Sequence, residues 1–256
     1  MEAMTSPAGI EALLAQYPKP RPALPPAYES VYVEHYRANR AGRAGLSRVT
    51  QKLEAWMHRR VAEGVRGRIL EVGAGNLNHV QYHPAAEVYD AVEPFRELWE
   101  GSPALARVRR MYASLDDVPD HERYDAVLSI AVLEHLTDLP YIVARSALLL
   151  ADGGSFRAAF PSEGGLLWGL AWRLTTGVEF RLRRGLDYGV LMRHEHVNTA
   201  AEILAVLGYF FESVAIDRFP TPAPGLSFYT AAIASRPRVE RCEAFCTDRA
   251  RVGARP

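Results

Sequence analysis

A short apolar run that ends in a carboxylate and two glycines is the feature that most constrains the fold of this chain. The run reads Arg68-Ile69-Leu70-Glu71-Val72-Gly73-Ala74-Gly75-Asn76. It predicts a buried strand followed directly by a tight turn. Glycine suits such a turn because it lacks a Cβ atom and tolerates positive φ. We therefore expect a nucleoside-containing ligand to lie over the carboxyl end of this strand.

Alternating strand-like and helix-like segments surround this motif and predict an α/β fold. Helices are expected at 46–64, 94–100, 140–151 and 199–208, the last from the capping-box spacing of Thr199 and Glu202. Such alternation predicts a Rossmann-like, doubly wound and mostly parallel sheet, and a final strand pair would add one antiparallel member. Because only eight residues separate Gly75 from Pro84, the first crossover should be short or irregular. The expected strands are 68–72, 88–93, 108–112, 124–130, 155–160, 210–216 and 227–235.

The length of 256 residues, of which 48% are hydrophobic, suits one α/β core with additions. A proline-rich segment at the start predicts an extended arm, and the stretch after the fifth strand interrupts the alternation, as a lid would. The boundaries expected are 1–64 for the N-terminal arm and cap helices, 65–161 for the cofactor-binding core, 162–198 for the lid or substrate insertion, 199–236 for the C-terminal part of the core, and 237–256 for a C-terminal helix or tail.

Charge and hydropathy argue against two classes of partner. The formal net charge is zero, so the chain has no overall basic field for nucleic acid. The apolar run at 166–172 is far shorter than a membrane span, and no basic segment followed by an apolar core marks a secretory signal. We therefore expect a cytoplasmic protein that binds neither nucleic acid nor membrane. The oligomeric state does not follow from the sequence.

The residue that ends the second strand bears on the kind of ligand. Glu93 follows Glu71 by 22 residues, the position from which a carboxylate accepts both ribose hydroxyls of a nucleoside. The dinucleotide fingerprint requires a third glycine, but Asn78 stands there. Glu71 would repel a phosphate and suits a sulfonium or an ammonium group. A ligand without a pyrophosphate is favoured, and an NAD(P)-dependent oxidoreductase is the alternative.

Four motifs in order carry a family resemblance. They are Glu71-Val72-Gly73-Ala74-Gly75, Ala91-Val92-Glu93-Pro94-Phe95, the stretch from Tyr124 to Leu136 that contains Leu133-Glu134-His135, and Leu148-Leu149-Leu150-Ala151-Asp152-Gly153-Gly154. Over residues 66–235 the chain resembles the class I S-adenosylmethionine-dependent methyltransferases, in particular the methyltransferase-11-like small-molecule subgroup. The resemblance implies a seven-stranded sheet with one antiparallel strand and S-adenosylmethionine as the cofactor.

The resemblance also implies roles for individual residues. Glu71 would orient the cofactor's amino group, Glu93 would hold the ribose, and Phe95 would pack near the adenine. An N-terminal helix that begins near Pro26 would bring Tyr36 over the cofactor. The whole set expected to bind the cofactor is Glu71, Gly73, Ala74, Gly75, Asn76, Glu93, Pro94, Phe95, Ala113, Ser114, Ala131, Val132 and Tyr36.

Three histidines are the candidates for catalysis: His196, then His135 and His194. An imidazole titrates in the range needed to accept a proton from a hydroxyl or an amine. His194-Glu195-His196 also has the composition of a metal site. However, alternate residues of an extended segment face opposite ways, and the sequence offers no third ligand, so no metal is expected.

The expected reaction is displacement at the sulfonium methyl group by an oxygen or nitrogen atom of a small molecule, such as a secondary metabolite, a sugar or a sugar nucleotide. Five arginines in the insertion suggest an anionic acceptor: Arg173, Arg181, Arg183, Arg184 and Arg193. A catalytically inactive, cofactor-binding regulatory protein and transfer to RNA or protein stay open as alternatives.

Overall fold

The computed structural model describes residues 6–29, 31 and 48–253 of the chain. Residues 26–29 are helical, which agrees with a helix beginning at Pro26. Most of that expected helix lies outside the described residues, and so does Tyr36 with its expected place over the cofactor. Among the helices described, none combines the length and the apolar character that a membrane crossing demands.

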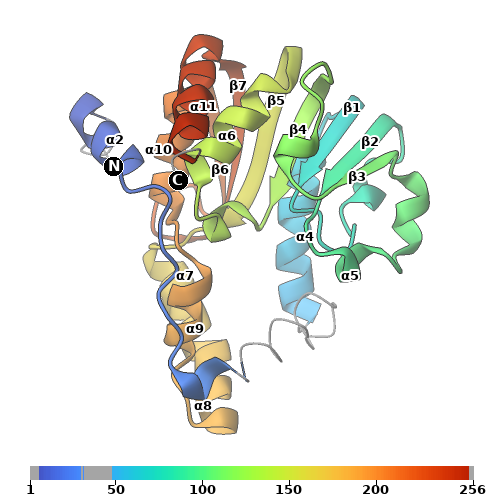
Figure 1. Ribbon diagram of the computed structural model, residues 1–256. Coiled ribbons are helices and arrows are strands. Elements are labelled where there is room, and N and C mark those ends of the chain that lie inside the picture. The colour runs from blue at the N-terminus through green and yellow to red at the C-terminus, as the bar shows by residue number, and fades with distance from the viewer. Residues whose placement is uncertain (1–5, 30, 32–47, 254–256) are drawn as a thin grey trace.

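A seven-stranded sheet in the order β3-β2-β1-β4-β5-β7-β6 forms the centre of the protein (Figure 1). The strands β1 to β5 run parallel, whereas β7 is antiparallel to both of its neighbours. The predicted mixed sheet with one antiparallel member is therefore confirmed. The bounds are β1 Gly67–Val72, β2 Ala86–Val92, β3 Arg110–Tyr112, β4 Tyr124–Ile130, β5 Leu150–Pro161, β6 Phe211–Pro220 and β7 Ser227–Pro237.

The fifth strand differs from its expected form, whereas the first crossover has the form expected of it. β5 begins at Leu150 rather than at residue 155, because residues 151–154 form a bulge between Leu150 and Ser155, which both pair with β4. Gly153 has a φ of +76° there, which glycine tolerates. After β1, the crossover contains only the 3₁₀ turn η1 (Val80–Tyr82), as its eight-residue length predicted.

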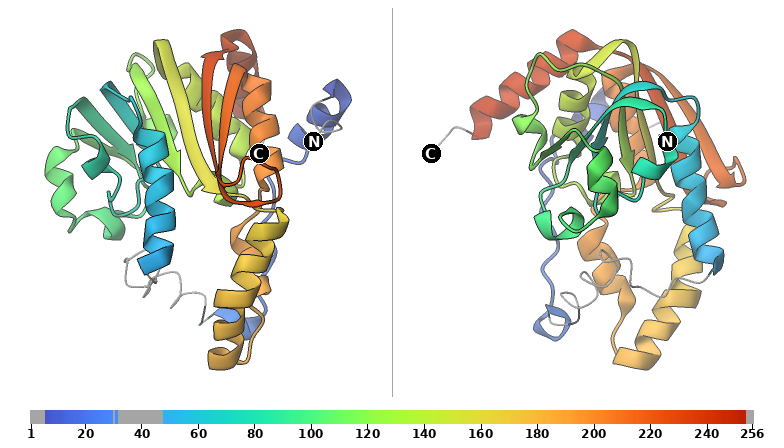
Figure 2. Two further views of the ribbon diagram at one scale, coloured as in Figure 1. Left: turned by 180° about the vertical axis from the view of Figure 1, so that it is seen from behind. Right: turned by 90° about the vertical axis from the view of Figure 1, so that its right-hand side faces the viewer.

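Helices cover both faces of the sheet (Figure 2). α4 (Arg48–Ala62) lies on one face, and α6 (Leu139–Leu148), α10 (Ala200–Phe210) and α11 (Val239–Gly253) lie on the other. Side chains of one strand alternate between the faces: Ile69 belongs to the core under α4, and Leu70 belongs to the core under α6 and α10. Shorter elements along the β2 and β3 side are α5 (Arg96–Trp99), η2 (Pro103–Arg107) and η3 (Leu115–Asp117).

The segment after β5 forms a helical projection beyond the carboxyl ends of the strands (Figure 1). It consists of α7 (Leu166–Trp172), the π-helical turn η5 (Arg173–Gly177), α8 (Val178–Arg184) and α9 (Tyr188–Glu195). The N-terminal arm, which begins with α2 (Pro7–Leu14), runs along this projection. Tyr28 of the arm packs with Phe180 and Leu191 in a small apolar cluster. The arm is thus part of the insertion's core.

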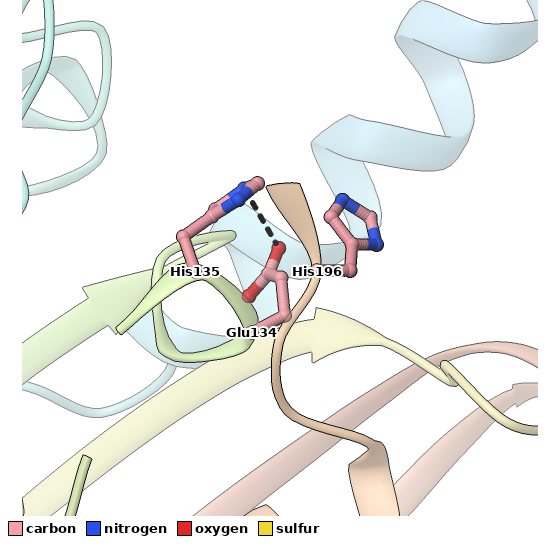
Figure 3. Close-up of side chains that lie close together, drawn as sticks. All are labelled: Glu134, His135 and His196. Carbon is pink, nitrogen blue, oxygen red and sulfur yellow. Dashed lines mark ion pairs between the residues drawn. The ribbon is translucent and has the colours of Figure 1, made fainter. Parts of the chain in front are cut away.

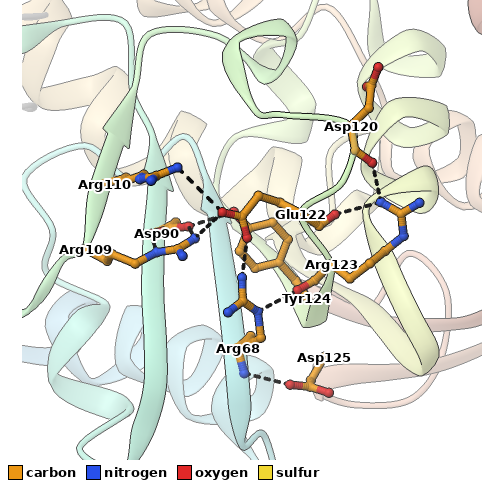
Figure 4. A network of polar contacts seen from close by, with 9 residues as sticks. All are labelled: Arg68, Asp90, Arg109, Arg110, Asp120, Glu122, Arg123, Tyr124 and Asp125. Carbon is orange, nitrogen blue, oxygen red and sulfur yellow. Dashed lines mark hydrogen bonds and ion pairs between the residues drawn. The ribbon is translucent and has the colours of Figure 1, made fainter.

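A buried charge network joins strands β2 and β4 on the side of the sheet away from the projection (Figure 4). Asp90 of β2 is fully buried and accepts hydrogen bonds from Nε of Arg109 at 3.0 Å and from Oη of Tyr124 at 2.7 Å. Arg109 also contacts Glu122, which in turn binds Arg68 at the start of β1. A buried carboxylate needs such partners because its desolvation is costly.

Replacing Arg109 by leucine should lower the free energy of unfolding by about 3–5 kcal/mol, because it leaves the buried Asp90 carboxylate without its cation. Urea unfolding at neutral pH measures the change. Arg110→Leu is the matched control: this arginine is half-exposed and lies 3.6 Å from Glu122, so its loss should cost much less than the loss of Arg109. Equal losses in the two variants would contradict the role given to Asp90.

Candidate active site

The turn after β1 places a carboxyl group and two glycines at the carboxyl edge of the sheet. Glu71 is 3% exposed, and Oη of Tyr89 donates a hydrogen bond of 2.7 Å to its Oε2. Gly73 has a φ of +77°, and a Cβ atom there would lie 2.5 Å from Cγ2 of Val132. Gly75 has a φ of +51°, and a Cβ atom there would meet no atom within 4 Å. The backbone at Gly75 therefore borders open space, as a ligand-binding turn requires.

The second carboxylate lies at the tip of the neighbouring strand. Because Val72 of β1 pairs with Val92 of β2, Glu93 begins at the level of the glycine turn. Its Oε2 accepts a hydrogen bond of 2.9 Å from the backbone N–H of Gly75, and its Oε1 accepts one of 3.1 Å from that of Phe95. These bonds fix the orientation of the carboxylate beside the turn. The structure thus brings the two predicted acids to one place.

The remaining expected cofactor residues lie at the ends of β2, β3 and β4. Pro94 and Phe95 are exposed after β2, and the backbone carbonyl of Asn76 accepts a hydrogen bond from Ser102. Ala113 is exposed after β3, and Ser114 begins η3 with hydrogen bonds from its N–H and Oγ to Asp117.

The turn after β4 completes this edge. Ala131 is exposed with a φ of +53°, and its N–H donates to the carbonyl of Ala159 on β5. Positive φ is uncommon for a residue with a Cβ atom and is found most often where the surrounding structure fixes the backbone. Val132 follows and touches the glycine turn after β1. Ala74, between the two glycines of that turn, is buried.

Two of the three candidate catalytic histidines meet beside this turn (Figure 3). The rings of His135, in η4 (Leu133–His135), and His196, directly after α9, pack edge to face with centroids 4.8 Å apart. Between them lies the carboxyl group of Glu134, which is 1% exposed and has Oε1 at 3.7 Å from Nε2 of His135. Ligand atoms of Glu134, His135 and His196 all lie within 4.8 Å of one another.

Each of these histidines is oriented by a second acidic residue. Nδ1 of His196 lies 2.9 Å from Oε2 of Glu163, and Nδ1 of His135 lies 3.0 Å from the backbone oxygen and 3.3 Å from the carboxylate of Glu195. Burial alone would lower the pKa of His135, but the hydrogen bond to Glu195 and the charges of Glu134 and Glu195 raise it above its ordinary value. Burial alone would raise the pKa of Glu163, but the hydrogen bond to His196 lowers it.

The third candidate, His194, is directed elsewhere. Its Nδ1 lies 2.7 Å from the backbone oxygen of Pro22 in the N-terminal arm. Arg21 of that arm donates hydrogen bonds to the backbone oxygens of His194, Glu195 and His135. The arm therefore ties the end of α9 to η4, and His194 takes part in that contact.

Sequence reasoning missed several residues that build the site. Glu134 was part of a recognised motif, but nothing in the sequence paired it with His196. Glu163 lies in the predicted insertion, and nothing in the sequence paired it with His196. Tyr89, which binds Glu71, and Arg21 carried no local signal, because their partners lie on other elements.

Comparisons with known proteins give a family match and several similar structures. Residues 36–199, more than half of the chain, match the family described as Methyltransferase domain. A search of curated proteins returned no match.

Solved structures share the fold at low sequence identity. An O-methyltransferase family protein from Burkholderia thailandensis is 16% identical with a TM-score of 0.50, over 82% of this chain and 62% of that one. The chain thus spans less than two thirds of that protein's length. The DhpI-SAM-HEP complex is 18% identical with a TM-score of 0.52, over 83% of this chain and 100% of that one. The plantazolicin methyltransferase BpumL in complex with SAH is 12% identical with a TM-score of 0.54, over 92% and 97%.

The buried carboxyl group of Glu71 should make stability depend on pH. Burial raises its pKa from the ordinary value of 4.5 to about 8. Because the folded chain holds this proton more tightly than the unfolded chain, the folded state loses stability as the pH rises from about 4.5 to about 8. Glu71→Gln keeps an acceptor for Tyr89 and removes the titration. We compare the free energy of unfolding of the variant with that of the wild type at two pH values. The variant's value relative to the wild type should be higher at pH 8.5 than at pH 5 by more than about 1.4 kcal/mol, the equivalent of one pKa unit.

Urea unfolding of the cofactor-free protein at both pH values measures this difference. Glu87→Gln, on the exposed start of β2, is the control. Its free energy of unfolding should differ from that of the wild type by the same amount at pH 5 and at pH 8.5. A Glu71→Gln variant that gains nothing at high pH would show that the carboxyl group is already ionised near neutral pH.

Proposed function

Because the chain belongs to the Methyltransferase domain family, we propose that it transfers a methyl group from S-adenosylmethionine to an oxygen or nitrogen atom of a small-molecule acceptor. That it is a methyltransferase with S-adenosylmethionine as its cofactor follows from the family, and this sets aside the oxidoreductase. The acceptor class is the proposed part.

One observation supports the cofactor site most strongly: two buried carboxyl groups, Glu71 and Glu93, flank a turn with two positive-φ glycines. The chemistry of this donor set fits S-adenosylmethionine. Glu71 would face its ammonium group, the open space at Gly75 would admit its methionine part, and Glu93 would accept hydrogen bonds from its ribose. The exposed ring of Phe95 and the residues Ala113 and Ser114 would border its adenine.

The cofactor supplies the methyl group together with its own leaving group, so the protein has to position the acceptor and raise its nucleophilicity. We assign this task to the cluster of Glu134, His135 and His196, because it stands beside Val132, which touches the glycine turn. His196 is the foremost candidate to act on the acceptor. Its Nδ1 is engaged by Glu163, so Nε2 is the ring nitrogen left to face the cluster.

A small molecule is favoured over RNA or protein as the acceptor. The net charge of zero gives no general attraction for a phosphate backbone. One of the similar solved structures is the plantazolicin methyltransferase BpumL. The insertion's arginines Arg173, Arg181, Arg183, Arg184 and Arg193 are exposed, and an anionic acceptor stays a prediction.

Incubation of the protein with methyl-labelled S-adenosylmethionine and fractions of a cell extract tests the proposed function. Label should appear in an acid-soluble small molecule, and the label should be lost when the extract is passed through a filter that removes small molecules. Label in acid-precipitable RNA or protein would contradict the proposed acceptor class. Thermal shifts give the parallel control: S-adenosylhomocysteine should raise the melting temperature, and NAD and NADP should not.

Replacing Glu93 by alanine should weaken the binding of S-adenosylhomocysteine by about 1–3 kcal/mol, because charge-assisted hydrogen bonds to the ribose are lost. This corresponds to a rise in Kd of roughly 5- to 150-fold in calorimetry. Glu97→Ala, on the exposed first turn of α5, is the matched control and should keep the wild-type Kd. Because Glu93 also binds Gly75, Glu93→Gln serves as a milder second variant. Unchanged affinity in both Glu93 variants would remove Glu93 from the site.

A further inference from the structure

We propose that Glu134, His135 and His196 form a binding site for one divalent transition-metal ion of the zinc type. From the sequence, no metal was expected, because the two histidines around Glu195 had no third ligand. The fold instead pairs His196 with the Glu134-His135 dipeptide of η4, and ligand atoms of these three residues lie within 4.8 Å of one another (Figure 3). Imidazole nitrogen and carboxylate oxygen are ligands that zinc and its neighbours accept.

The outer contacts of the two histidines are those of metal ligands. A metal-bound histidine typically uses its second ring nitrogen to donate to a carboxylate or a backbone carbonyl, which fixes the ring and leaves a lone pair on the ligating nitrogen. Here Nδ1 of His196 meets the Glu163 carboxylate at 2.9 Å, and Nδ1 of His135 meets the backbone oxygen of Glu195 at 3.0 Å. Both contacts leave Nε2 as the ligating atom.

The burial of the Glu134 carboxyl group independently supports a cation at this place. The residue is 1% exposed, and its Oε2 has no hydrogen-bond partner among the residues that the structure describes. Its other oxygen, Oε1, lies 3.7 Å from Nε2 of His135. A carboxylate removed from water with one oxygen unsatisfied costs free energy. A cation bound at Oε1, the oxygen that faces His135, would offset part of the cost of burying the charge (Figure 3).

The distances require only a modest closure around an ion. Zinc binds nitrogen and oxygen at about 2.0–2.2 Å, so tetrahedral ligand atoms lie about 3.4 Å apart. The present separations of up to 4.8 Å would shrink by at most about 1.4 Å through side-chain rotation. Three protein ligands leave a fourth position open, as in catalytic zinc sites.

The location of the cluster suggests how the ion would act on the acceptor, and this role rests on the proposed function. The cluster follows the β4 turn, whose Val132 touches the glycine turn of the cofactor site. An acceptor hydroxyl in the fourth position would have a lowered pKa, because the ion stabilises the oxygen anion. The site therefore favours an oxygen over a nitrogen acceptor.

Titration of the tag-free, EDTA-treated full-length protein with Co²⁺ and Zn²⁺ tests the site without cofactor or acceptor. We expect one ion per chain by calorimetry and visible absorption bands of low-coordinate cobalt that zinc abolishes. Glu134→Gln and His196→Ala should each weaken binding at least tenfold, and Glu163→Gln should weaken it by about 10- to 100-fold through the orientation of His196. His194→Ala is the matched control, since this histidine contacts Pro22 instead, and it should bind as the wild type does.

Absence of binding by the wild type, or equal affinity in the wild type, Glu134→Gln and His196→Ala, would overturn the metal site. The S-adenosylhomocysteine-induced thermal shift of each variant shows that it is folded, so that loss of metal binding is not loss of structure. The labelled-methyl experiment, repeated in EDTA, separates the two proposals. If the wild type binds no metal in the titration but still transfers methyl groups in EDTA, the metal site is wrong and the proposed function is retained.

Discussion

The close approach of two turns, one after β1 and one after β4, is the constraint on which the rest of the site depends. Gly73 lies so near Val132 that a Cβ atom at residue 73 would be 2.5 Å from Cγ2 and 2.7 Å from Cγ1 of the valine. The first turn is flanked by the two acids Glu71 and Glu93, and the second leads into Glu134 and His135. Because the turns touch, the proposed cofactor residues and the polar cluster keep a fixed spacing, which a reaction between two bound molecules would need.

A second set of contacts holds the cluster from outside. Asn198 is buried, accepts a hydrogen bond from Tyr17, and donates to the backbone oxygens of Leu133 and Leu136 on either side of the cluster. The backbone oxygen of Glu134 accepts from the N–H groups of residues 197 and 198. The N-terminal arm, the β4 turn and the end of α9 are therefore joined by hydrogen bonds that meet at Asn198.

Two buried acids of the sheet show how stability and function diverge. Asp90 has Arg109 and Tyr124 as partners, so its charge supports the fold. Glu71 has only the hydroxyl of Tyr89 among its described hydrogen bonds, and burial raises its pKa to about 8. A buried carboxylate without a cationic partner lowers the stability of the ligand-free protein. The same carboxylate can bind a cationic ligand. Departures of this kind from stable design are expected at functional sites.

The sequence by itself determined the strands of the sheet and the edge at which Glu71 and Glu93 lie together. Apolar runs and glycine turns are local signals, so β4 was placed at residues 124–130 without error, and the parallel order with one antiparallel strand followed from alternation and the family's motifs. Glu71 and Glu93 could be paired because adjacent parallel strands end at one edge.

Only the tertiary structure decided which side chains meet across elements. The path of the insertion brings His196 next to Glu134 and His135, and Glu163 contacts Nδ1 of His196. Arg21 of the arm binds the backbone oxygen of His135. Such meetings depend on the direction in which a helical projection doubles back, which no local periodicity encodes. Interactions within a strand or turn could therefore be read from the chain, whereas those between distant segments were fixed by packing alone.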